Sequence, residues 1–131
     1  MKVRKSFASL AATAGAVAAV VLAPGTANAS SGGGCAGTYE VRACISASGA
    51  YLKPDGYILS NVSACRTTYI SLTDITTGAI LQQESVGCWP GHYGPFPYKG
   101  INGHRYGVRV FMLGSSGLLA SQWSYAETFS N

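Results

Sequence analysis

The chain has 131 residues with nine Lys and Arg, five Asp and Glu, and four Cys. This length fits one small domain and excludes a large multidomain enzyme. With 47% hydrophobic residues, the composition is that of a chain able to bury a core.

The first 29 residues have the pattern of a secretory signal peptide. A cationic head at residues 2–5 precedes an Ala-, Val- and Leu-rich run from 10 to 23. This run is shorter than the about 20 residues that a permanent membrane span needs. Small residues stand at Ala27 and Ala29, so we expect cleavage after Ala29. An Ala-rich leader of this kind is typical of exported bacterial proteins.

Cleavage would change the charge of the protein. Three of the nine basic residues lie in the leader and none of the five acidic ones do, so residues 30–131 carry 6 − 5 = +1. The remaining basic residues are scattered along the sequence: Arg42, Lys53, Arg66, Lys99, Arg105 and Arg109. This composition does not indicate a nucleic-acid partner, and we expect no stable membrane insertion of the mature chain.

The mature chain begins with a segment that predicts a flexible leader. Residues 30–34 are only Ser and Gly. Residues 35–131 are expected to form a single domain, in which runs rich in Val, Ile, Thr and Tyr alternate with Gly, Pro, Asn and Asp. This alternation predicts an all-β fold.

The first expected strand runs from Tyr39 to Ala47. Its odd-numbered residues from Tyr39 to Ile45 would share one face, and its even-numbered residues from Glu40 to Ser46 the other. Pro54-Asp55-Gly56 predicts a tight turn, because Pro presets φ and Gly accepts a positive φ. Residues 57–62 are a further candidate strand.

The middle of the chain predicts a hairpin. Its strands are 66–74 and 79–86, joined by a loop at 75–78. If the loop is centred on residues 76 and 77, the numbers of facing residues sum to 153. This centring gives the following facing pairs: Leu72 with Leu81, and Cys65 with Cys88.

A second hairpin is predicted near the end of the chain. Its strands are 104–113 and 118–128, joined by a turn at 114–117. If the turn is centred on residues 115 and 116, the numbers of facing residues sum to 231. The facing pairs are then Tyr106 with Tyr125, Val108 with Trp123, and Met112 with Leu119.

Six or seven short strands, each with one apolar face, bury these faces best when two sheets pack face to face. We therefore predict an antiparallel β-sandwich of immunoglobulin- or fibronectin-like type, and the Tyr-Gly-Val-Arg-Val run at 106–110 resembles the late strands of fibronectin-type domains. A small antiparallel barrel is the alternative.

The four Cys predict disulfides and an oxidising compartment, because their number is even and all lie in the exported portion. The hairpin register favours Cys65–Cys88, which leaves Cys35–Cys44. A continuous strand from Tyr39 would make the second bond awkward, so the two other pairings stay open. No Cys-x-x-Cys and no His at ligand spacing occurs, so we expect neither a metal nor a cofactor.

The sequence gives no catalytic assignment. It has two His and five carboxylates, without the spacing of a hydrolase elbow, a metal-binding helix or a phosphate loop. The carboxylates stand at turns and on strands, where solvated groups are common. His104 begins a strand, where a hydrogen-bonding role is expected, and His92 lies in an unusual loop.

That loop, residues 88–98, is the predicted binding segment. Three Pro and two Gly make it stiff, and rigid aromatic loops are used in recognition. The residues expected to bind are Trp89, His92, Tyr93, Phe96 and Tyr98. The same rings could contact a protein, stack on a glycan or cap the open end of the sandwich.

These features together predict a secreted, extracellular and non-enzymatic binding domain, whose partner is an unidentified extracellular protein or glycan. A hydrolase inhibitor is one concrete version. The chain is similar to small secreted amylase inhibitors in size, Cys number and sheet content, but lacks the Trp-Arg-Tyr tripeptide that they present. A carbohydrate-binding module and a small secreted hydrolase are the alternatives from other classes.

Overall fold

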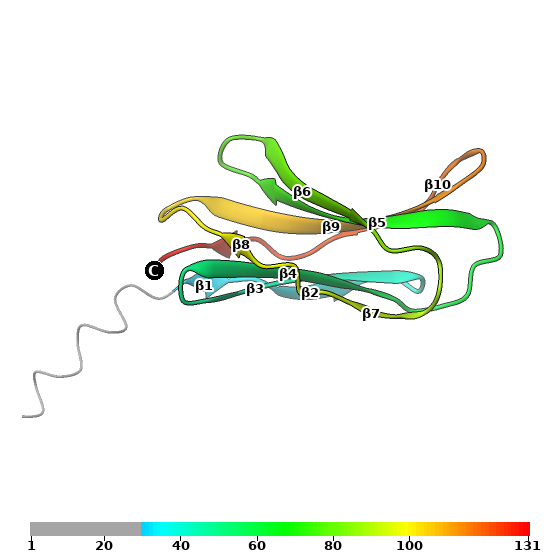
Figure 1. The fold of residues 1–131 in the computed structure, drawn as a ribbon, viewed down its shortest axis with the longest axis horizontal. Helices are drawn as coiled ribbons and strands as arrows, with labels where there is room; N and C mark the ends of the chain where they lie inside the picture. The colour runs from blue at the N-terminus through cyan, green and yellow to red at the C-terminus, as the bar shows by residue number, and fades with distance from the viewer. Residues whose placement is uncertain (1–29) are drawn as a thin grey trace, which may run out of the picture.

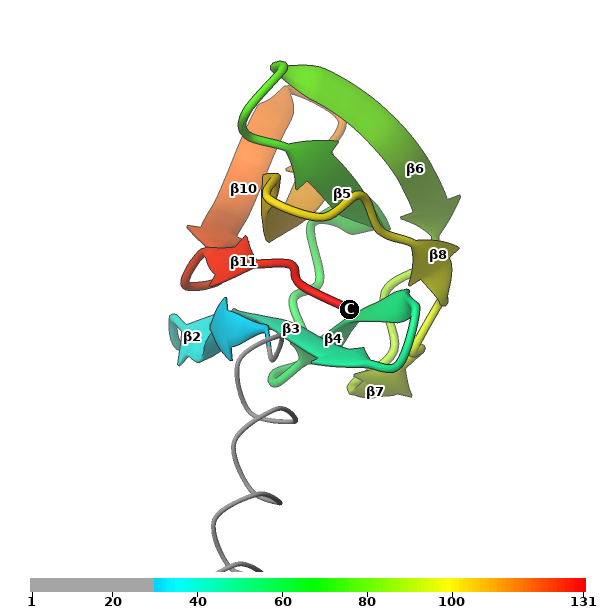
Figure 2. The same cartoon turned by 90° about the vertical axis from the view of Figure 1, so that its left-hand side faces the viewer.

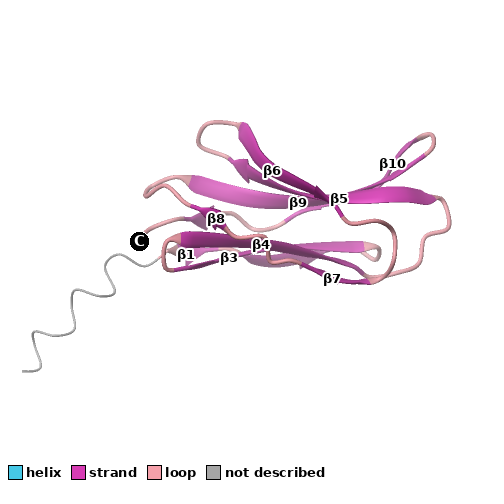
Figure 3. Cartoon of the chain, viewed as in Figure 1, coloured by secondary structure: helices cyan, strands magenta, loops and turns pink. Residues whose placement is uncertain are grey.

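A computed structural model describes residues 30–131, and the predicted signal peptide lies outside this range. The described residues form eleven β-strands and the loops between them (Figure 1, Figure 3). Within residues 30–131, no helix is long and apolar enough to span a bilayer.

The strands form two antiparallel sheets. Sheet A has six strands in the order β1, β11, β9, β5, β6, and β10 also pairs with β9. Its strands are β1 (Ser31–Gly32), β5 (Cys65–Asp74), β6 (Ala79–Ser85), β9 (Arg105–Gly114), β10 (Gly117–Trp123) and β11 (Glu127–Thr128). Sheet B has the order β2, β3, β4, β7, and β8 also pairs with β4. Its strands are β2 (Gly34–Gly37), β3 (Val41–Ser48), β4 (Tyr51–Ile58), β7 (Gly91–Tyr93) and β8 (Tyr98–Lys99).

The two sheets lie face to face as two layers (Figure 2). Alternate residues of the long strands enclose the core because side chains of a strand point to opposite faces in turn. The buried apolar residues are Val41, Ala43, Ile45, Leu52, Ile58, Ile70, Leu72, Tyr106, Val108, Val110, Met112 and Phe129. The prediction of an all-β sandwich is thus confirmed, whereas an immunoglobulin- or fibronectin-like type stays a prediction.

The predicted turn at Pro54-Asp55-Gly56 is wrong, because these residues lie inside β4. The chain instead turns at Gly49, whose φ is +60°, between β3 and β4. Pro54 fits the strand because β7 and β8 pair with the same side of β4 but leave a gap between them, and the backbone of Pro54 points into this gap. There its carbonyl accepts a hydrogen bond from the Phe96 N–H at 2.9 Å, and no N–H is required of it.

Gly56 serves the packing of the two layers. A Cβ atom at this position would lie 2.6 Å from Cγ2 of Val110 and 3.0 Å from Cδ1 of Ile70, both on sheet A. The absence of a side chain therefore lets the sheets approach closely.

The hairpin of β5 and β6 turns at residues 75–78, as predicted. Next to the turn, Asp74 faces Ala79, which matches the predicted sum of 153. A register shift after Leu72 then makes Leu72 face Gln82 and not Leu81. The cause is a β-bulge, which adds one residue to one strand.

The hairpin of β9 and β10 shows the same kind of shift. Leu118 faces Leu113 with the predicted sum, but the register changes between Leu118 and Ala120. The three predicted facing pairs are therefore wrong: Met112 faces Ala120, Trp123 faces Arg109, and Tyr106 faces Glu127 of β11. This one-residue shift turns Trp123 to the outer face of sheet A, where it is 44% exposed.

The N-terminal part of the domain also differs from expectation. Residues 31 and 32 of the expected flexible leader form β1 and pair with β11, which needs only backbone groups. The oxygen of the Ser30 side chain joins the two ends of the described chain, donating to the Ser130 carbonyl at 3.0 Å and accepting from the Ser130 N–H at 2.8 Å.

Both favoured disulfides are present, Cys35–Cys44 and Cys65–Cys88. The return of the chain after Cys35 is made by a turn at Thr38, whose side-chain oxygen accepts from the Val41 N–H at 3.1 Å. β2 can therefore pair with β3, and Tyr39 is left outside the core. The hairpin ladder does not itself place Cys65 opposite Cys88, because β6 ends at Ser85.

Candidate binding site

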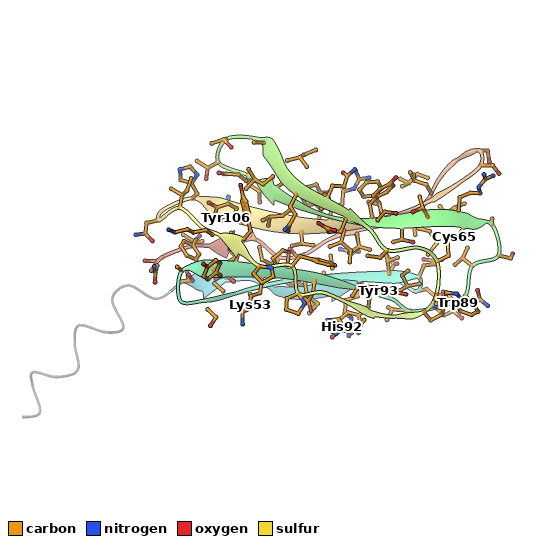
Figure 4. The ribbon with its side chains drawn as sticks, viewed as in Figure 1. Lys53, Cys65, Trp89, His92, Tyr93 and Tyr106 are labelled. Atoms are coloured by element: carbon orange, nitrogen blue, oxygen red, sulfur yellow. A yellow bond between two sulfur atoms is a disulfide. The ribbon has the colours of Figure 1, made fainter. Side chains whose placement is uncertain are left out.

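The predicted binding segment 88–98 is divided between the inside and the outside of the sandwich. Tyr93, Phe96 and Tyr98 pack against the core. Trp89 is 77% exposed, and His92 is on the outer side of sheet B. Figure 4 shows Tyr93 between the layers and both Trp89 and His92 pointing away from them. The division arises because β7 pairs with β4, so that neighbouring side chains point to opposite faces.

Trp89 lies on a firmly held backbone. Tyr93 donates its hydroxyl hydrogen to the Trp89 carbonyl at 2.6 Å. The preceding residue, Cys88, is bonded to Cys65, and Pro90 follows. The indole ring is therefore presented to solvent on a segment with little freedom to lose on binding.

A hollow of about 360 Å³ lies beside this ring. Its lining residues are Asn61, Val62, Ser63, Cys65, Arg66, Cys88 and Trp89. The Cys65–Cys88 disulfide forms part of the wall of the hollow. The loop that precedes Cys65 is held by a hydrogen bond from the Cys65 N–H to the Val62 carbonyl at 3.0 Å. We call this hollow with its lining residues the braced end.

Sequence reasoning missed three polar residues of the braced end, namely Asn61, Ser63 and Arg66. They belong to the polar stretch just before and after Cys65. The signal that could have found them is the Cys65–Cys88 bond itself, because it must bring this stretch beside Trp89.

His92 takes part in a row of side chains across the outer face of sheet B. Its Nε2 lies 2.6 Å from Oδ2 of Asp55, and its ring stacks on Tyr57 with a centroid distance of 4.4 Å. The guanidinium of Arg42 lies over the same tyrosine ring at 5.5 Å. The register explains the row, because Tyr57 of β4 pairs with Arg42 of β3 and with His92 of β7.

His104 lies at the opposite end of the molecule, bonded to buried Asp74 through its Nδ1 at 2.7 Å. Burial works to raise the pKa of Asp74, but hydrogen bonds from His104 and the Thr77 backbone hold it below its ordinary value. This arrangement stabilises the 75–78 turn. Within the described chain, no Ser, Thr or Cys side chain is hydrogen-bonded to either histidine, as an activated nucleophile would be.

A metal site is not formed by residues 30–131, since they contain no group of three His, Cys, Asp or Glu that could hold an ion. The two disulfides indicate an extracellular or otherwise oxidising compartment.

Comparison with protein-family models, curated proteins and solved structures gives no match for the chain. Function can therefore be inferred only from the chemistry of the site.

Proposed function

We propose that the chain is an exported, non-enzymatic binding domain that holds a glycan at the braced end. The observation that carries this proposal is the ring of Trp89, 77% exposed on a fixed backbone beside a hollow of about 360 Å³. Small-ligand sites commonly have volumes of roughly 300–1,000 Å³.

The chemistry of the lining suits a sugar. A sugar ring has an apolar C–H face and a rim of hydroxyl groups. The indole of Trp89 supplies a flat surface for the face. Asn61, Ser63 and Arg66 supply donors and acceptors for the rim.

Binding is favoured over hydrolysis because of what lines the hollow. A glycosidase needs two carboxyl groups roughly 5–9 Å apart across the bond that it cleaves. The lining has no Asp, Glu or His side chain. The braced end can therefore orient a glycan, but supplies no acid and base to cleave it.

The proposal is tested by binding of residues 30–131 to a panel of immobilised polysaccharides. We expect Trp89→Ala to weaken binding at least about tenfold, as for an aromatic anchor at the centre of a contact. Trp123→Ala is the matched control, because Trp123 is also exposed but lies on the outer face of sheet A. Unchanged binding by Trp89→Ala would rule out the braced end as the site.

Fluorescence gives a second measurement. The chain has two Trp, so Trp123→Phe leaves Trp89 as the one indole reporter. Added glycan should shift its emission and protect it from a soluble quencher.

A protein partner, such as a hydrolase that the domain inhibits, is the second candidate. It is supported by the same exposed, rigidly held indole, since Trp is enriched among the anchors of protein interfaces. In this case Trp89→Ala would relieve inhibition of a target enzyme, and free glycans would not shift the fluorescence of Trp89.

A further inference from the structure

We infer that the outer face of sheet B extends the braced end into a track for an acidic, linear polysaccharide. This inference rests on the proposed glycan-binding function and names the class of glycan. It starts from the distribution of charge that the fold creates.

The fold gathers basic residues that are scattered in the sequence. Positions 52, 54, 56 and 58 of β4 are buried against the core, so the alternate positions face outward. Arg42 pairs with Tyr57, and Lys99 pairs with Tyr51, so both point to the same outer face. Three of the six basic residues of the described chain therefore share this face: Arg42, Lys53 and Lys99.

Few carboxylates oppose them. Asp74 and Glu127 are buried between the layers, and Glu84 is on β6 of sheet A. Asp55 is on the outer face but is engaged by His92 at 2.6 Å. Glu40 lies at one margin, just before β3. Three basic residues against these two carboxylates leave a formal excess of 3 − 2 = +1 on the face, which favours a ligand bearing negative charge.

In the row across this face, Arg42 is the group placed to receive a carboxylate, since His92 is already bonded to Asp55. The tyrosine ring supports the guanidinium at 5.5 Å and the imidazole at 4.4 Å. Asp55 fixes the imidazole through its Nε2. A guanidinium held in this way donates paired hydrogen bonds to a planar acid group.

The shape of the face fits an extended chain. β4 has eight residues, which at roughly 3.3 Å per residue gives a length of about 26 Å. Tyr51, 49% exposed, lies at one end of it, and Trp89 lies beyond the other. Figure 4 shows Lys53, His92 and Trp89 following one another along this side of the molecule. Ring faces at both ends with cations between them match a polymer of acid-bearing sugars.

Calorimetry with oligogalacturonates of increasing length, and with neutral oligosaccharides of equal length, tests the track. We expect tighter binding of the acidic series, rising with length, and weakening as salt increases from about 0.05 to about 0.5 M. Arg42→Gln and Lys53→Gln should each lower affinity for the acidic series about two- to fivefold, the effect of one exposed ion pair. Arg105→Gln is the charge-matched control, because Arg105 is exposed on sheet A, and should change nothing.

The outcomes separate this inference from the proposed function. If neutral and acidic oligomers bind equally, and only Trp89→Ala weakens them, the track is wrong and the braced end stands. If Arg42→Gln and Lys53→Gln weaken acidic binding while Trp89→Ala does not, the charged face binds on its own, and the braced end and its place in the track are wrong. Equal competition by single-stranded DNA would show a general attraction for polyanions and overturn the track.

Discussion

The two ends of the sandwich are held together in different ways. At the braced end, the Cys65–Cys88 bond ties the start of β5 to the loop after β6, and a hollow remains beside it. At the other end, Asp74 and His104 form a hydrogen-bonded pair, and Phe129 fills the space between the layers. A covalent bond holds chain segments without needing side chains packed around it. At the end held by hydrogen bonds, Asp74 and Phe129 are themselves buried.

The hydrogen-bonded end is filled closely. The Phe129 N–H donates to the His104 carbonyl at 2.9 Å, and the Phe129 carbonyl accepts from the Gly103 N–H at 2.9 Å. A Cβ atom at Gly100 would lie 2.7 Å from the Phe129 ring. Any enlargement here would displace buried atoms, whereas the lining of the braced end borders open space.

The largest expected effect is at the braced end. Replacing Cys65 and Cys88 together by Ser should lower the free energy of unfolding by about 3 kcal/mol, because the bond closes a long loop of the unfolded chain. Thermal unfolding should shift down by on the order of 15 °C. The double variant Cys35→Ser/Cys44→Ser is the control, with a sequence separation of 9 against 23, and should lose somewhat less. An equal or larger loss in the control would contradict the comparison.

A smaller effect is expected for Asp74→Asn at the hydrogen-bonded end, about 2 kcal/mol, because a buried hydrogen-bonded charge is removed. Since the pKa of Asp74 is lowered on folding, its carboxylate stabilises the fold above the ordinary value of 3.8. This contribution is lost as the pH falls through the folded pKa. Urea unfolding at neutral and acidic pH measures this loss. The free energy of unfolding should fall less at acidic pH in the variant than in the wild type. The same pH dependence in both proteins would refute this role of the Asp74 carboxylate.

The smallest effect on stability is expected for Glu127→Gln, which should stabilise the fold where the previous variants destabilise it. Asp74 and Glu127 both face Tyr106 from neighbouring strands, but burial raises the pKa of Glu127. Its ionised form therefore disfavours folding at neutral pH. The variant should gain about 1 kcal/mol there.

The pH dependence checks this second carboxylate separately. In the wild type, the Glu127 contribution improves as the pH falls from the raised folded pKa toward the ordinary value of 4.5. Glu127→Gln should remove this rise, as measured by urea midpoints across that window. A destabilised variant at neutral pH would show that the carboxylate makes a needed contact.

The strands and disulfides could be predicted from the sequence better than the registers. Alternation between apolar and polar residues located most of the strands, but a bulge in each hairpin leaves no mark in that alternation. In β4 the local turn propensity of Pro and Gly was misleading. Pro54 is tolerated where no N–H is required, and Gly56 is required by the opposite sheet, which only the three-dimensional packing reveals.

The candidate site could be predicted only in part. The sequence located the stiff aromatic segment, but not which rings face outward, because that depends on the pairing of β7 with β4. His92 is outside and Tyr93 inside for this reason, whereas Trp89 precedes β7 and is exposed on the loop. The residues that complete the braced end, Asn61, Ser63 and Arg66, come from another part of the chain.

The meeting of Ser30 with Ser130 has a practical consequence. Both termini of the described chain leave the molecule at the end away from Trp89 (Figure 1, Figure 4). A tether fused to either one would therefore leave the indole pointing outward from a sensor chip or a bead. The same proximity makes the domain suitable for circular permutation, with a short linker joining the old termini and new ones opened at the exposed turn of residues 115 and 116.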